Sequence, residues 1–162
     1  ISIVTNAGSL FLLKDLKVQG QYELEKPESY YTSCYFQKDD QLLVATSGNE
    51  VYQWDMINHK RKEERIISTG KFSNIHSMQM DEENHLWLCT DSGVGYVDKE
   101  NQFIPVKTGA FNSSVDNMTQ NYQGNLWFAS SRLGVLKLCK NAFSNVYEQS
   151  QTAEKVVNSV VK

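Results

Sequence analysis

The sequence predicts an all-β protein made of repeated units of four short antiparallel strands, and three observations lead to this prediction. First, one phrase occurs twice, as NHLWLCTDSGVGYV at residues 84–97 and as GNLWFASSRLGVLKL at residues 124–138. Second, short apolar runs rich in strand formers alternate with clusters of Gly, Asn, Asp and Ser, which is the pattern of successive hairpins. Third, no convincing helical period of about 3.6 residues occurs between residues 1 and 147.

The repeated phrase extends to four copies along the chain. Trp87 and Trp127 lie 40 residues apart, and Thr5, Thr46 and Thr90 follow one another at lags of 41 and 44. Four short antiparallel strands in a unit of about 40–45 residues are typical of a β-propeller blade. Stacking such sheets face to face buries both apolar faces of each sheet. A β-sandwich is the alternative, but a sandwich does not require the same phrase four times.

The unit at residues 74–110 shows the expected parts most clearly. Its strands are predicted at residues 75–80, 86–90, 94–98 and 103–107, separated by turns at 81–85, 91–93 and 99–102. The tryptophan of each unit is expected to fill the space between neighbouring blades, because a buried aromatic side chain covers a large apolar area. Glycines are expected where turns require a positive φ or a close backbone approach, namely at Gly93, Gly95, Gly124 and Gly134.

These units divide the chain into three complete blades and two partial ones. The complete blades are predicted at residues 30–70, 74–110 and 114–147. Residues 1–25 would form a partial blade that begins at its second strand, and residues 155–162 would supply the first strand of the next blade. The segment 152–162 could also form a short helix. Either the two ends join into a ring of four blades, or the chain is a piece of a larger propeller, which we favour because four-bladed rings are uncommon.

Two stretches resemble a known repeat. DEENHLWLCTDSGVGYVD at residues 81–98 and NYQGNLWFASSRLGVLKL at residues 121–138 are similar to the two-component regulator propeller repeat, whose consensus is roughly D-x-x-G-x-L-W-h-G-T-x-x-G-L, with h apolar. The leading Asp is present as Asp81 but is Asn121 and Gln37 in other units. The Gly before the Thr is replaced in three units, by Ala45, Cys89 and Ala129.

The resemblance implies a sensor. In that family, propellers form the extracytoplasmic region of membrane-anchored bacterial regulators, whose output domain is a histidine kinase or a diguanylate cyclase. Their ligands are often oligosaccharide fragments, and a homodimer is one way in which they signal. No kinase or cyclase motif occurs in these 162 residues, so the output domain would lie elsewhere in the parent chain.

Charge and composition argue against several other functions. The formal net charge is -3, with acidic and basic residues mixed along the chain, whereas a nucleic-acid interface needs a clustered basic patch. The one basic cluster, HKRKEER at residues 59–65, also contains acidic residues. This pattern indicates a strand exposed to solvent. No stretch approaches the roughly 20 apolar residues of a membrane span, so we expect no membrane insertion by this segment.

No catalytic, metal or cofactor motif stands out. The three histidines, His59, His76 and His85, do not lie at metal-ligand spacing. The three cysteines, Cys34, Cys89 and Cys139, form no Cys-x-x-Cys pair. The glycines within residues 92–95 precede neither a P-loop lysine nor a helix. Paired carboxylates would indicate a propeller lyase or glycosidase, and only Asp91 and Asp116 are candidates. We therefore expect a non-enzymatic protein without a cofactor or metal.

A ligand site is expected at one end of the blades. The loops that enter each first strand and the loops between second and third strands open on the same face of a propeller. The polar residues at these places would suit a sugar or a small anion; they are Tyr30, Thr32, Asn74, His76, Asp91, Ser114, Asp116 and Arg132. The alternative is that these are ordinary solvated loops.

The sequence therefore favours a ligand-sensing, non-catalytic, extracytoplasmic propeller that binds a small ligand, which the resemblance would make an oligosaccharide. Binding or dimerisation would shift the population of a distant output domain. The alternative is a protein–protein interaction scaffold without a small-molecule ligand. An enzyme is a more distant alternative.

Overall fold

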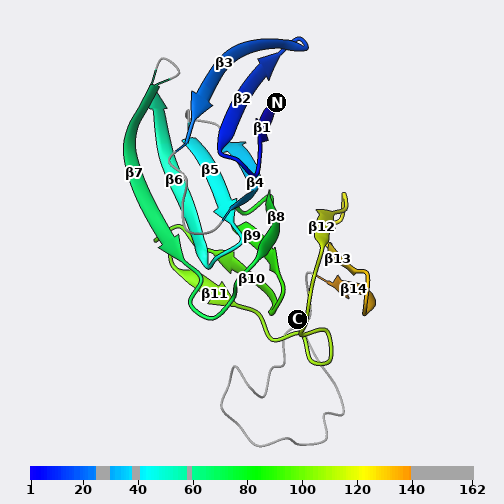
Figure 1. Ribbon diagram of the computed structural model, residues 1–162. Helices are drawn as coiled ribbons and strands as arrows, with labels where there is room; N and C mark the ends of the chain where they lie inside the picture. Colours follow the sequence, from blue (N-terminus) through cyan, green and yellow to red (C-terminus); the bar gives the residue numbers. More distant parts are fainter. Residues whose placement is uncertain (25–29, 38–40, 58–59, 140–162) are drawn as a thin grey trace, which may run out of the picture.

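The computed structural model describes residues 1–24, 30–37, 41–57 and 60–139, which form four antiparallel sheets (Figure 1). The first sheet contains β1 (Ser2–Val4), β2 (Ser9–Lys14) and β3 (Lys17–Glu23). The second contains β4 (Tyr31–Gln37), β5 (Gln41–Thr46), β6 (Glu50–Ile57) and β7 (Lys60–Ser68). The third contains β8 (Ile75–Met80), β9 (Leu86–Thr90), β10 (Gly93–Val97) and β11 (Phe103–Pro105). The fourth contains β12 (Asn117–Gln120), β13 (Leu126–Ser130) and β14 (Gly134–Leu138).

The strands of every sheet follow chain order, so each sheet is a simple meander. Contacts between sheets run mainly through their first strands, because β8 touches both β4 and β12. Among the described residues, the first sheet has no strand equivalent to β4, β8 and β12, and its β1 contacts β4 instead. This arrangement confirms the predicted all-β fold class, with sheets of three or four strands placed as successive blades.

The four sheets lie within the predicted units at residues 1–25, 30–70, 74–110 and 114–147. The predicted strand at residues 86–90 matches β9, while β10 begins one residue earlier than predicted and β11 is two residues shorter. The boundaries of the units remain predictions. The predicted strand at residues 155–162 and the end of the last unit lie outside the described residues.

Three hairpin turns share one hydrogen-bond pattern, which explains the leading Asp or Asn of the repeat. The side chain of Asp81 accepts hydrogen bonds from the main-chain N–H groups of residues 83 and 85. Asp98 and Asn121 accept the equivalent pairs in their own turns. The fourth residue of each turn adopts a positive φ, which Asn and Gly tolerate best; φ is 65° at residue 84, 60° at residue 101 and 80° at residue 124.

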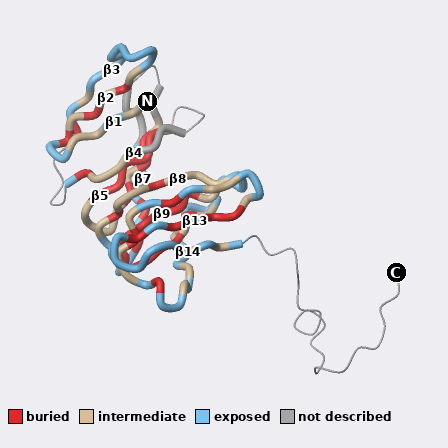
Figure 2. The backbone as a smooth tube through the Cα atoms, turned by 90° about the vertical axis from the view of Figure 1, so that its right-hand side faces the viewer, coloured by how far each residue is buried: buried red, intermediate tan, exposed pale blue. Residues whose placement is uncertain are grey.

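The core consists of three apolar clusters, one between each pair of neighbouring sheets. Strand β9 is buried along its whole length: Leu86 and Leu88 belong to the cluster shared with the second sheet, whereas Trp87 and Cys89 belong to the cluster shared with the fourth. Alternate residues of a strand point to opposite faces, so this strand requires a sheet on each side. Figure 2 shows the buried residues concentrated where the sheets meet.

Trp87 fills the space between the third and fourth sheets, as predicted. It is 7% exposed, and its ring centroid lies 5.4 Å from that of Phe128 on the next sheet. Its indole N–H also donates to Asp81 over 2.9 Å. The equivalent Trp127 differs, because it is 37% exposed on the outer face of the fourth sheet, where no described residue forms a further blade.

The two tryptophans therefore provide a matched test of blade stacking. Trp87→Ala should lower the free energy of unfolding by about 3–5 kcal/mol, the usual cost of removing a buried aromatic side chain. Trp127→Ala should cost clearly less, because its ring is already partly in water. Urea denaturation followed by circular dichroism measures both values, and equal losses would contradict the proposed stacking.

Candidate functional site

The predicted ligand face is built on a β-bulge that recurs in neighbouring first strands. The pairing register shifts between Tyr31 and Ser33 in β4 and between Ile75 and Ser77 in β8. The extra residue at each shift is therefore Thr32 or His76. A bulge redirects the side chain of its extra residue. Thr32 and His76 therefore depart from the alternation of side chains that the rest of each strand follows.

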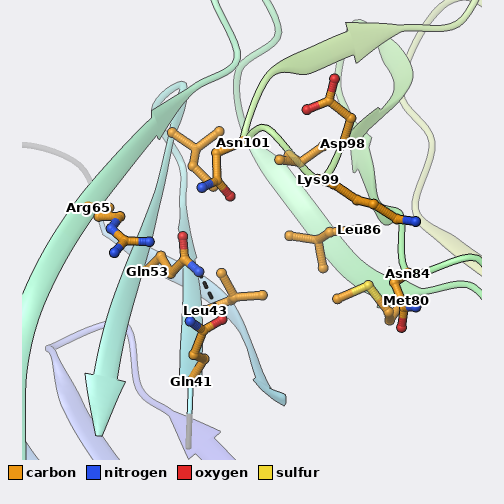
Figure 3. A pocket seen from close by; sticks show the side chains of 12 residues that line it. Gln41, Leu43, Gln53, Arg65, Met80, Asn84, Leu86, Asp98, Lys99 and Asn101 are labelled. Carbon is orange, nitrogen blue, oxygen red and sulfur yellow. Dashed lines mark hydrogen bonds between the residues drawn. The ribbon is translucent and has the colours of Figure 1, made fainter. Parts of the chain in front are cut away.

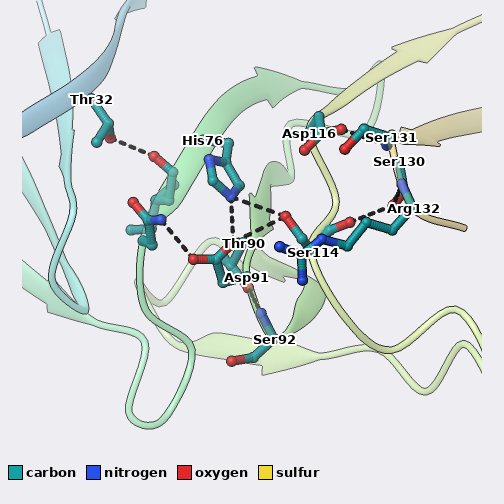
Figure 4. Close-up of polar contacts among 12 residues, drawn as sticks. Thr32, His76, Thr90, Asp91, Ser92, Ser114, Asp116, Ser130, Ser131 and Arg132 are labelled. Atoms are coloured by element: carbon teal, nitrogen blue, oxygen red, sulfur yellow. Dashed lines mark hydrogen bonds and ion pairs between the residues drawn. The ribbon is translucent and has the colours of Figure 1, made fainter.

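Four of the predicted residues come together in one polar cluster: Asn74, His76, Asp91 and Ser114. Figure 4 labels the last three. Asp91 lies at the centre. Its Oδ2 accepts a hydrogen bond from the amide of Asn74 over 2.6 Å, and its Oδ1 lies 2.7 Å from His76 Nε2 and 3.0 Å from the hydroxyl of Ser114. The cluster joins the loop before β8, the turn after β9 and the loop before β12.

Main-chain hydrogen bonds fix the loops that carry these side chains. Asn74 has a φ of 56°, which asparagine tolerates better than most residues. Its N–H points to the carbonyls of Ser47 and Gly48 in the second sheet, at 3.1 and 2.9 Å. The N–H of Val115 donates to the carbonyl of Thr90 over 2.9 Å. The site is therefore assembled across three sheets.

Hydrogen bonding lowers the pKa of both carboxyl groups in this region. The Asn74 amide contributes most to lowering the pKa of Asp91; His76 and Ser114 add to this effect, while partial desolvation opposes it. The pKa of Asp116 is also lowered, first by the main-chain N–H of Ser131, which donates to Oδ2 over 2.6 Å. Both shifts favour the ionised form of the carboxyl group.

The combination of Ser114, His76 and Asp91 is not arranged as a catalytic triad. In a triad, the serine and the carboxylate contact different nitrogens of the imidazole. Here both contact Nε2, with Ser114 Oγ at 3.4 Å and Asp91 Oδ1 at 2.7 Å. Because an ionised carboxylate only accepts hydrogen bonds, Nε2 carries its hydrogen toward Asp91 and cannot take a proton from the serine. The geometry fits binding of polar groups.

The other predicted residues lie around the cluster but do not bond Asp91. Thr32 donates to the carbonyl of Ile75 on the neighbouring sheet, which is a structural contact. Tyr30 is 51% exposed, and its main-chain N–H donates to the hydroxyl of Ser47. Figure 4 shows Asp116 beside Ser131 and the side chain of Arg132 extending toward Ser114.

Sequence reasoning missed Ser130, whose hydroxyl fixes the loops that carry Ser114 and Arg132. Its hydroxyl donates to the carbonyl of Ser114 over 2.6 Å and accepts hydrogen bonds from the N–H groups of Arg132 and Leu133. The repeat contained the signal, because Ser130 occupies the position of Thr46 and Thr90. Both of these hydroxyls likewise bond main-chain carbonyls in their own units.

Some site types have no counterpart in the residues that the structure describes. No group of three or more His, Cys, Asp or Glu side chains there could hold a metal ion. The same residues include no helix long and apolar enough to span a membrane. Cys34, Cys89 and Cys139 are free thiols, and burial raises the pKa of Cys89 to about 11, so this thiol is not poised as a nucleophile.

The pKa of Asp91 provides a direct test of the cluster. A carboxyl group whose pKa is lowered by folding stabilises the protein above its unfolded-state pKa of about 3.9. That contribution is lost as the pH falls through the lowered folded-state value. Asn74→Ala should raise the pKa of Asp91 toward its ordinary value and reduce this acid sensitivity. Titration of the carboxyl carbons by ¹³C NMR measures the change.

Asp116 is the internal control for this titration, because its lowered pKa depends first on Ser131 and not on Asn74. Its titration should move little in the Asn74→Ala variant. An unchanged midpoint for Asp91 would show that the Asn74 contact does not exist in solution.

Comparison with known proteins supports the fold and leaves the family open. No protein-family model matches the chain, and no curated protein matches it. Among solved structures, the WD40 β-propeller domain of Doa1 matches with a TM-score of 0.70 and 14% identity, over 94% of this chain and 48% of that one. The extracellular domain of a putative hybrid two-component system from B. thetaiotaomicron matches with a TM-score of 0.60 and 19% identity, over 83% of this chain and 18% of that one.

A computationally designed protein, Ika4, also matches, with a TM-score of 0.61 and 13% identity, over 85% of this chain and 83% of that one. The chain spans 48% of the Doa1 domain and 18% of the two-component extracellular domain. Identities this low establish the fold alone. Together with the four meandering sheets, they show that the described residues form β-propeller blades.

Proposed function

We propose that this chain is the ligand-sensing, non-catalytic part of an extracytoplasmic signal-transduction receptor, and that its ligand is a small carbohydrate. The observation that carries the proposal is the cluster of Asn74, His76, Asp91 and Ser114. Residues distant in sequence converge there at one end of the blades, joined by hydrogen bonds of 2.6–3.0 Å to Asp91.

The chemistry of the cluster suits hydroxyl groups. An ionised carboxylate has about four acceptor positions, and three of those of Asp91 are used by Asn74, His76 and Ser114. The side chain of Asp91 is 45% exposed, so its remaining acceptor position is open to solvent. A sugar hydroxyl could donate there and accept a hydrogen bond from Arg132, whose side chain extends toward Ser114 (Figure 4).

The role as a sensor rests on two resemblances. The segments at residues 81–98 and 121–138 are similar to the two-component regulator propeller repeat, and the fold matches the extracellular domain of a putative hybrid two-component system. In the proposed receptor, an output kinase or cyclase domain belongs to a longer, membrane-anchored parent chain. Ligand binding or formation of a homodimer shifts the conformational population of that domain.

A protein–protein interaction scaffold is the second candidate, since the WD40 domain of Doa1 has the same fold. The two candidates differ in what the polar cluster does. A scaffold would use a broad surface and would not require the Asp91 carboxylate for small-molecule binding. A carbohydrate sensor would lose affinity when that one charge is removed.

Titration of the ¹⁵N-labelled chain with maltose, cellobiose, xylobiose and mannobiose tests the proposal. We expect at least one disaccharide to shift the main-chain signals of Asn74, Asp91 and Ser114 in a saturable manner. Asp91→Asn should then weaken binding about tenfold or more, because a hydrogen bond to a charged group contributes about 1.5–3 kcal/mol.

Asp15→Asn is the matched control, since Asp15 lies in the distant turn after β2 and has a φ of 52°, which asparagine accepts. Affinity should not change in this variant. If none of the four disaccharides shifts the cluster, or if Asp91→Asn binds as tightly as the unchanged chain, the carbohydrate-sensing proposal is wrong and the scaffold is favoured.

A further inference from the structure

A cleft lies at the end of the blades opposite the Asp91 cluster, between the second and third sheets (Figure 3). Its volume is about 310 Å³, at the lower end of the range of small-ligand pockets. The floor is apolar, formed by buried residues of the shared core such as Leu43, Ile67 and Leu86. The rim carries amide and charged groups from two turns and from β7, including Asn84, Asn101 and Lys99.

Two hydrogen-bonded amides, Gln41 and the buried Gln53, line this cleft, and a neighbouring carboxylate fixes the orientation of both. Gln41 Nε2 donates to Asp55 Oδ1 over 3.2 Å, which leaves Gln41 Oε1 as an acceptor. Gln53 Nε2 donates to that oxygen over 2.9 Å. Because a carboxylate only accepts hydrogen bonds, neither amide can be turned around without facing two acceptors toward each other.

This fixed polarity leaves Gln53 Oε1 without a donor. The Gln53 side chain is only 7% exposed, and its Oε1 is buried with no hydrogen-bond partner among the described residues. In Figure 3 the carbonyl oxygen points away from Gln41, toward the side where Asn101 lies. A buried acceptor without a partner is costly, and such atoms in folded proteins require an explanation.

Comparison of the second and third sheets shows that Gln53 stands where the third sheet has an aromatic residue. Leu43 and Gln53 pair across one hairpin, at the positions occupied by Trp87 and Tyr96 in the following sheet. In that sheet the two aromatic rings lie 5.1 Å apart and pack in the core. The second sheet thus has a smaller apolar residue and an amide where an aromatic pair would complete the packing.

We propose that this cleft is a second ligand site, which binds a neutral polyhydroxylated molecule of about the size of a monosaccharide. Because Gln53 Oε1 is enclosed in the free protein, binding requires a small shift of the rim side chains, which lets a hydroxyl group of the ligand donate to this oxygen. Other hydroxyls exchange hydrogen bonds with the amides of Asn84 and Asn101, since hydroxyl and amide groups both donate and accept. The C–H face of the ligand covers Leu43 and Leu86. This site is independent of the cluster around Asp91.

The experiment is a titration of the ¹⁵N-labelled chain with D-glucose, D-galactose, D-mannose and D-xylose in turn, followed through the side-chain amide signals of Gln41 and Gln53. At least one sugar should shift the Gln53 signals in a saturable manner. Gln53→Met, which keeps the length of the side chain but removes the acceptor, should weaken binding about tenfold, as expected for loss of a hydrogen bond; this variant is followed through the signals of Gln41 and residues 98–101.

Two further variants keep the test decisive. Asn101→Gly removes a rim amide at a residue with a φ of 60°, which glycine adopts readily, so it should weaken binding without disturbing the turn. Gln21→Met is the matched control, since Gln21 lies on β3 and bonds only Glu23 with its side chain among the described residues; its affinity should be unchanged.

The proposal is overturned if none of the four monosaccharides shifts the Gln53 signals, or if Gln53→Met binds as tightly as the unchanged chain. Asp91→Asn should leave this binding unchanged. Shifts confined to Asn74, Asp91 and Ser114 would support the proposed function while contradicting this second site.

Discussion

Burial of both faces of each central sheet is the constraint on which the rest of the structure depends. In β5 the residues Leu42 and Val44 pack against the first sheet, while Leu43 and Ala45 pack against the third. Strand β9 divides its side chains in the same way. A sheet with two apolar faces cannot remain in water, so each one requires a neighbour on either side. The outer faces of the first and fourth sheets have no described neighbour, and they expose Ile3 at 45% and Trp127 at 37%.

This stacking also creates the two candidate sites. Because the first strands β4, β8 and β12 lie side by side, the loops that enter them meet at one end of the blades. Asn74 and Ser114, from loops of neighbouring sheets, can therefore bond the same carboxylate of Asp91. At the other end, two hairpin turns of the third sheet and strands of the second sheet line the cleft that contains Gln53. Each site depends on the packing of sheets against each other.

The fold could be predicted from the sequence because the stacking constraint repeats with the unit. The threonines and tryptophans mark corresponding strands, and register alone brought Asn74, His76, Asp91 and Ser114 to one face. The bulges at Thr32 and His76 could not be predicted, because they arise from pairing within each sheet. The contact of Thr32 with Ile75 and the unpartnered oxygen of Gln53 were also beyond prediction. The first depends on the distance between two sheets, and the second on side-chain geometry around Gln53; the sequence pattern contains neither.

A crystal structure of the chain grown with an equimolar mixture of maltose, cellobiose, xylobiose and mannobiose would test the central claim most directly. The account predicts electron density for a sugar beside Asp91, within hydrogen-bonding distance of its carboxylate and of Arg132. The blades should remain stacked as described, with Asn74 and Ser114 still directed at Asp91. A well-ordered structure in which this end contains only water, while the sugar lies elsewhere or is absent, would contradict the assignment of the cluster as the sensing site.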